Sequence, residues 1–256
     1  MYNLLLRSIL QPSTQPSAKY QKPYRFECQQ CGKCCSDKET IVNLTYTDIL
    51  RINSQNNLTL EELLNIVGYY IYENEPTQDQ LQKMVVPPIL TQRGPAFLGL
   101  RKDDKGKCVF LSESNRCTIY QSRPAICRSF PFHFHYTPVP KPEKRIDIEM
   151  TCAAKAIEYC PGIGAPYKIV NSQKWLQVGE ETLKDLLKEV ILIKQWNEAV
   201  KAKKITPSAE NYSKNILKIP QFYPDHNSSS TQSLEKERGK KERKSYQNRV
   251  KQKLPK

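Results

Sequence analysis

The sequence predicts an α+β fold: an irregular, cysteine-organised domain with short strands, followed by a helical C-terminal extension and a disordered basic tail. Helical start patterns and apolar stripes, short apolar runs broken by Pro and Gly, and the confinement of all nine cysteines to residues 28–160 predict this class. Leaving out Tyr and adding Gly, roughly 36% of the residues are apolar, against about 45 to 50% in an ordinary globular domain. Bound metal would therefore help such a chain to fold.

We expect four segments along the chain. Residues 1–24 form an irregular lead-in with Pro12, Pro16 and Pro23, and residues 25–165 form a cysteine-cluster metal-binding domain. A helical extension over 166–224 follows. The tail, 225–256, has too little apolar surface to offset the entropy lost on ordering.

The helices are predicted at three places. Residues 48–55 form a first, weakly indicated helix. A second begins after Thr59, which with Glu62 makes a capping box, and its apolar spacing continues to Ile71. The longest helix spans about 181–203, with an apolar stripe typical of a packing surface.

Short strands are predicted where apolar runs are brief. Within 84–136 these runs are 85–88, 96–100, 108–111 and 118–120, and residues 132–136 form a further strand. Residues 145–149 alternate apolar and charged side chains, as a half-buried strand does.

Several classes of protein are disfavoured. The mean hydropathy is −0.65, and no apolar run approaches the about 20 residues of a membrane-spanning helix, so we expect a soluble protein without a membrane partner. Residues 1–10 are too short and too weakly apolar for a signal peptide, which predicts a cytoplasmic location. In that reducing compartment cysteines more often bind metal or do chemistry than form disulfides.

The net charge of +14 is concentrated in the tails, since residues 225–256 carry +6 and residues 1–24 carry +3. A basic tail can bind nucleic acid weakly through phosphates. Because acids interleave the bases, a solvated tail that keeps the protein dispersed is the favoured interpretation, with nucleic-acid binding as the alternative.

The cysteines fall into three groups, within residues 28–35, 108–127 and 152–160. Cys28-Gln-Gln-Cys31-Gly-Lys-Cys34-Cys35 has the C-x2-C-x2-C spacing of three ligands in a ferredoxin-type cluster, whose fourth cysteine is distant and followed by Pro, as in Cys160-Pro161. In extended backbone, neighbouring side chains point to opposite sides, so we expect Cys34 and Cys35 to serve two centres, or one of them to be a free thiol. The remaining cysteines are Cys108, Cys117, Cys127 and Cys152.

These motifs and the run Arg123-Pro-Ala-Ile-Cys127-Arg128-Ser-Phe130-Pro-Phe132 resemble the YkgJ-type CxxCxxCC cysteine-cluster family of zinc- or iron-chelating domains. The resemblance covers residues 25 to about 164 and ends at Cys160-Pro-Gly-Ile-Gly164. It implies eight metal ligands, which suit two four-thiolate centres or one binuclear cluster with spare thiols; Cys152 has no place in the pattern. The eight are Cys28, Cys31, Cys34, Cys35, Cys108, Cys117, Cys127 and Cys160.

Charged and aromatic residues flank these cysteines. Arg123 and Arg128 are candidate cofactor-binding residues that would offset cluster charge, with ordinary surface pairing as the alternative. His133 and His135 share a strand face and are either ligands or, as we favour with eight cysteines available, plain polar strand residues.

Cysteine-only ligation suits both iron-sulfur clusters and zinc. The triple spacing favours an iron-sulfur cluster, [4Fe-4S] first, and hence electron transfer or a redox reaction with an unidentified redox or protein partner. The alternative is a structural zinc module that mediates protein or nucleic-acid interactions. A third hypothesis, a methyltransferase-like role, is implied only by the similarity of the domain to flagellin lysine methylases. Catalytic residues and a substrate are not indicated, so whether the protein is an enzyme stays open.

Overall fold

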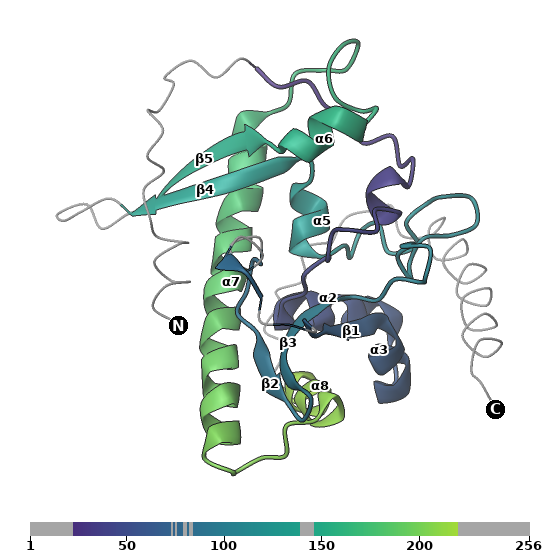
Figure 1. Ribbon diagram of the computed structural model, residues 1–256. Helices are drawn as coiled ribbons and strands as arrows, with labels where there is room; N and C mark the ends of the chain where they lie inside the picture. Colours follow the sequence, from purple (N-terminus) through teal and green to yellow (C-terminus); the bar gives the residue numbers. More distant parts are fainter. Residues whose placement is uncertain are drawn as a thin grey trace. The chain divides into compact units, whose positions relative to one another are not determined.

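The computed structural model describes residues 23–72, 74, 76–78, 81, 84–138 and 146–219. Most of the predicted lead-in and all of the predicted basic tail, 225–256, lie outside these residues. The fold is α+β, as predicted (Figure 1). Its elements are η1 (Lys33–Cys35), α2 (Tyr46–Asn56), α3 (Leu60–Ile66), β1 (Val67–Tyr70), β2 (Ile89–Thr91), β3 (Gly94–Leu100), α5 (Ala125–Ser129), β4 (Phe132–Pro138), β5 (Ile146–Cys152), α6 (Ala154–Tyr159), α7 (Ser172–Lys201) and α8 (Ala209–Leu217).

Two small antiparallel sheets carry the strands. The first has the order β1-β3-β2, with Val67 opposite Leu100 and Ile89 opposite Ala96. The second is the β4–β5 pair, in which Phe132 faces Cys152. Strand β3 is buried over most of its length because it lies between β1 and β2 at the centre of its sheet.

Helix α7 is the long support against which both sheets rest. It contacts β5, α5, β2 and α2, and Figure 1 shows it running past the β4–β5 pair and down to α8. Its apolar stripe, including Leu186, Ile193 and Trp196, shares one core with Leu63, Leu98 and Tyr212. The predicted boundary near residue 165 therefore does not separate two cores, since α7 and α8 complete the core of the preceding segment.

The capping boxes place the starts of α2 and α3. Thr59 and Glu62 exchange side-chain and backbone hydrogen bonds at the start of α3, as the sequence predicts. Thr45 and Asp48 do the same for α2, a capping box that was not predicted, and α2 begins at Tyr46 rather than at residue 48. The predicted continuation of the second helix to Ile71 is wrong. The chain turns extended at Val67 because β-branched and aromatic residues there pair with β3.

Other sequence predictions need adjustment. The runs 108–111 and 118–120 are turns with isolated bridges, Lys102 to Cys108 and Leu111 to Cys117, rather than strands. Helix α7 begins at Ser172, nine residues earlier than predicted, with Asn171 as its cap. The short helices α5, α6 and α8 were not predicted.

Within the described part of the chain, no helix has both the length and the apolar character that crossing a membrane requires.

A buried polar network joins α2, α5 and α7. Asp48, 1% exposed, accepts hydrogen bonds from Thr45 N and from Ala125 N, the latter at 2.8 Å. Arg51 bridges Asp48 at 2.7 Å and Asp185 of α7 at 3.1 Å. The Asp48 carboxylate thus fixes the start of α5 to the start of α2.

Glu189 of α7 is the fully buried acid of this region. Its carboxylate accepts from Tyr46 N at 2.6 Å and from the Tyr212 hydroxyl at 3.3 Å, and it is 0% exposed. Burial, together with the charges of Asp48 and Asp185, raises the Glu189 pKa to about 8 despite these two hydrogen bonds.

This carboxyl group should make stability depend on pH. Between the ordinary glutamate pKa and about 8, the unfolded chain has released a proton that the folded chain keeps, so stability should fall as pH rises. Glu189→Gln removes that titration. Measured by urea unfolding, its stability relative to the wild type should be about 1 to 3 kcal/mol more favourable at pH 8 than at pH 5.

The matched control is Glu180→Gln, which changes an exposed glutamate of the same helix. It should leave the pH dependence of the wild type in place. A Glu189→Gln variant whose pH dependence equals that of the wild type would show that the buried carboxyl group does not titrate in this range.

Candidate metal centre

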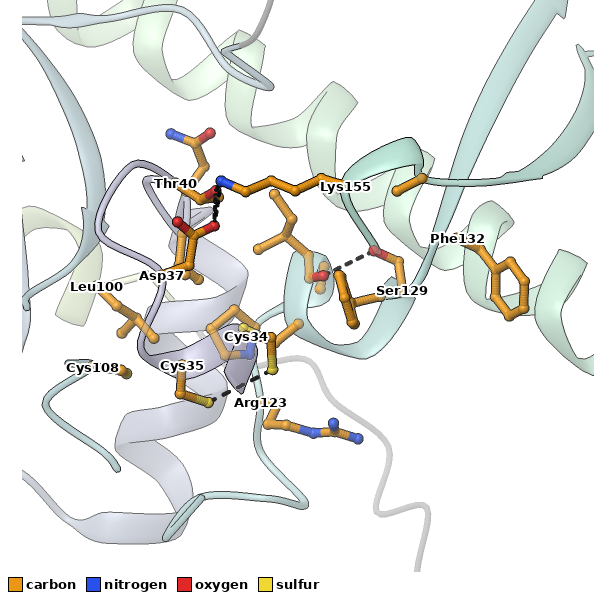
Figure 2. Close-up of a pocket in the computed structure, with 18 of the residues that line it drawn as sticks. Cys34, Cys35, Asp37, Thr40, Leu100, Cys108, Arg123, Ser129, Phe132 and Lys155 are labelled. Atoms are coloured by element: carbon orange, nitrogen blue, oxygen red, sulfur yellow. Dashed lines mark hydrogen bonds and ion pairs between the residues drawn. The ribbon is translucent and has the colours of Figure 1, made fainter. Parts of the chain in front are cut away.

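One cavity of about 1010 Å³ gathers the cysteines. All eight residues predicted as metal ligands line it, although the first and last of them, Cys28 and Cys160, are 132 residues apart in the chain. Cys152 does not line it. The eight are Cys28, Cys31, Cys34, Cys35, Cys108, Cys117, Cys127 and Cys160, and Figure 2 shows the part of the wall around Cys34, Cys35 and Cys108.

The first wall forms where the chain near residue 25 pairs with the chain after Cys160. Arg25 bridges Ile169 and Phe26 bridges Ile163, and Glu27 N donates to Gly162 O at 3.0 Å. A Cβ at Gly162 would lie 2.2 Å from Glu27 O, so only glycine allows this approach. The pairing brings Cys160 to the wall that carries Cys28 and Cys31.

The Cys34-Cys35 pair lies in a 3-10 turn, η1, which starts after Gly32 in the left-handed conformation at φ 75°. Their Sγ atoms are 3.9 Å apart and share a hydrogen bond (Figure 2). The expectation that the two side chains point to opposite sides is therefore wrong. Its premise was extended backbone, whereas the tight turn brings both thiols to the same cavity.

The second wall is built from loops. Cys108 N donates to Cys35 O at 2.7 Å, which joins the second cysteine group to the first. Leu111 then bridges Cys117. Cys127 lies on α5, whose first N–H is held by Asp48, so the buried polar network sets the position of this thiol.

Burial disfavours the charged form of most of these thiols. It raises the pKa of Cys108 to about 11, that of Cys117 above its usual value, and that of Cys127 well above it, in each case with added repulsion from other cysteines. Cys34 differs, because the hydrogen bond from Cys35, assisted by Arg123, lowers its pKa to about 7. A bound cation would relieve this repulsion and favour the thiolates.

The two arginines named by the sequence lie in different places. Arg123 lines the cavity, with its guanidinium 3.7 Å from the centre of the Tyr120 ring and its Nε donating to Tyr120 O at 2.8 Å. Its charge favours the thiolates of Cys34, Cys117 and Cys127. Arg128 is not among the lining residues and pairs with Glu181 of α7 at 3.4 Å, so its cofactor-binding role stays a prediction without support from its position.

The histidines also separate. His133 lines the cavity, and burial, with the nearby His135, lowers its pKa. His135 hydrogen-bonds Thr151 across the β4–β5 pair at 2.9 Å and does not line the cavity. Cys152 borders a smaller cavity of about 200 Å³ beside Tyr24 and Phe132.

The sequence did not point to an ion-pair cluster on the cavity wall. Lys155 of α6 contacts Asp37 at 2.6 Å (Figure 2) and Glu39 at 3.5 Å, and Lys102 donates to the carbonyl oxygens of Asp37 and Thr40. Burial opposes ionisation of Asp37, but the hydrogen bonds from Lys155 and Thr40 lower its pKa to about 2. These contacts tie the loop after Cys35 to α6, just before Cys160.

The thiols fit a metal in kind and number. The eight thiols around the cavity are enough sulfur ligands for zinc ions or for iron-sulfur clusters. Among the described residues, no three Cys, His, Asp or Glu side chains already converge on one point as ligands of a single ion. A metal centre here is therefore either a cluster, which can reach thiols that lie farther apart, or a single ion that draws the loops together when it binds.

Comparison with known proteins agrees with this site. The CxxCxxCC family, described as "Putative zinc- or iron-chelating domain", matches residues 27–160. The chain belongs to this family. Zinc or iron chelation is the family's description, which supports metal binding by this domain.

A similar curated protein is the uncharacterized protein MJ0661 of Methanocaldococcus jannaschii, 28% identical over 114 residues. That alignment covers 44% of this chain and 48% of the relative, so the chain spans about half the length of this relative. No solved structure matches.

The positions of the two arginines predict different effects on metal retention. Arg123→Gln removes a cation that favours the thiolates of Cys34, Cys117 and Cys127 and should weaken metal affinity about 10- to 100-fold. Arg128→Gln, the matched control, should change affinity little. Competition against a chromogenic chelator measures both, and equal affinities in the two variants would rule out this role for Arg123.

Proposed function

We propose that the cysteine cavity holds an iron-sulfur centre, [4Fe-4S] first, and that the protein carries electrons or supports a redox reaction in a partner. The observation that carries the proposal is the placement of Cys160 on the wall that carries the C-x2-C-x2-C cysteines. Three thiolates at this spacing, with a distant fourth before Pro161, are the ligand set of a ferredoxin-type cluster.

The surroundings suit a redox centre. Cys28, Cys31 and Cys34 are exposed, so a cluster on them lies where the redox group of a partner can approach. Aromatic side chains also line the cavity: the Phe130 and Tyr159 rings stack with their centroids 6.1 Å apart, and Phe132 is a further lining residue. Apolar walls and the Arg123 charge are the means by which a protein adjusts a cluster potential.

We also propose a cytoplasmic location, because all nine cysteines are free thiols and a reducing compartment keeps them available for metal.

A structural zinc module is the second candidate, and the loop character of the site favours it. The wall 101–124 contains no regular helix or strand and is built from turns and isolated bridges. Zinc on the same thiols would organise this wall without redox chemistry, and would leave protein interaction as the function.

Anaerobic purification followed by analysis of iron, zinc and acid-labile sulfide separates the two candidates. We expect iron and sulfide in similar amounts, a broad visible absorption, and bleaching by dithionite that air-free oxidant reverses. Zinc without sulfide would overturn the iron-sulfur proposal and leave the structural module.

Metal removal should loosen one part of the protein. The core of α2, α3, β3, α7 and α8 contains no metal ligand except Cys108, so far-UV circular dichroism should keep its helical signal in the metal-free protein. Within residues 25–219, trypsin should then cut first in the loop wall, at Lys105, Lys107 or Arg116, all of which are exposed. Equal protection of that loop with and without metal would show that metal does not organise it.

A further inference from the structure

We infer that the eight cysteines divide into two four-thiolate centres, one of Cys28, Cys31, Cys34 and Cys160 and the other of Cys35, Cys108, Cys117 and Cys127. The inference rests on the part of the proposed function that gives these thiols a metal, whichever metal that is. It adds the number of centres and the ligands of each.

The first set is held together by one backbone pairing. The chain at 25–27 pairs with the chain at 162–169, through the Arg25–Ile169 and Phe26–Ile163 bridges and the bond from Glu27 N to Gly162 O. Cys28 follows the first partner directly and Cys160 precedes the second, so the two cysteines lie at the same end of the pairing. Cys31 and Cys34 continue from Cys28 at the spacing of a cluster loop.

The second set is held together by a different chain of contacts. Cys108 N bonds to Cys35 O, Leu111 N bonds to Cys108 O, and Leu111 bridges Cys117. Cys35, Cys117 and Cys127 are partly buried against the same core that contains Cys108. The set therefore sits on the core side of the cavity, whereas Cys28, Cys31 and Cys34 are exposed.

The two centres meet at the Cys34-Cys35 pair. Their Sγ atoms, 3.9 Å apart, belong to neighbouring residues of one turn, so the centres are in direct contact through it. Arg123 lies beside Cys34 in Figure 2 and favours the thiolates of Cys34 from the first set and of Cys117 and Cys127 from the second. One guanidinium thus serves both centres.

The experiment compares metal content in serine variants of the anaerobically purified full chain. Cys160→Ser and Cys117→Ser should each retain about half of the wild-type metal. Cys28→Ser combined with Cys160→Ser, both in the first set, should lose no more than Cys160→Ser alone. Cys160→Ser combined with Cys117→Ser should lose nearly all, and Cys152→Ser, the matched control, should lose none.

The outcomes distinguish this inference from the proposed function. If the wild type holds zinc without sulfide, the iron-sulfur proposal fails, yet the half-loss pattern still supports two centres. If Cys160→Ser or Cys117→Ser alone loses all metal while circular dichroism shows the helical core intact, the cysteines form one centre and the division is wrong.

If a serine variant does not fold, measurements on the wild-type protein test the two-centre inference instead. Its metal content per chain should correspond to two centres, and if the metal is iron, the fully reduced protein should show an electron paramagnetic resonance signal broadened by interaction between two adjacent spins. Metal for a single centre, or an unbroadened signal from one cluster, would overturn the inference.

Discussion

The crowding of eight thiols around one cavity is the constraint on which this structure depends. Each thiolate raises the cost of ionising its neighbours, and burial of Cys108, Cys117 and Cys127 adds to that cost. One arginine, Arg123, is the cation that favours several of these thiolates from within the cavity wall. A metal is the chemical partner that resolves such an arrangement, because it replaces the protons and neutralises the charge at once.

The rest of the fold positions the cysteine-lined wall of the cavity, and most of the hydrophobic core lies outside that wall. Asp48 links the first turn of α2 to Ala125 at the start of α5, and Arg51 carries the link on to Asp185 of α7. Because these groups are buried and fully engaged, the position of Cys127 is set by polar contacts that persist whether or not metal is bound. The loops around Cys108 and Cys117 lie outside this polar network, and their turns and the core residues Phe110 and Ile119 hold them; bound metal would add to their order.

Local patterns predicted much of this fold. The capping box of Thr59 and Glu62 involves neighbouring residues only, so the sequence places the start of α3 correctly, and the family resemblance implied all the thiols that line the cavity. The strand at Val67–Tyr70 was missed because its pairing partner lies 30 residues away in β3. The Lys155–Asp37 pair was missed for the same reason, since a charged residue in a loop carries no mark of a distant partner.

The low apolar content of the chain is explained by the separation between its hydrophobic core and its cysteine loops. A protein poor in apolar residues can still build one adequate core if the apolar side chains gather in few elements, and here α2, α3, β3, α7 and α8 supply most of it. The cysteine loops contribute fewer residues to this core, among them Phe110 and Ile119, and ligation can add to hydrophobic burial as a source of their order. The two parts meet at Cys108, which is both a member of the core and a member of the cavity wall. Through this residue, a change of metal or oxidation state at the cavity would act directly on the packing of the core.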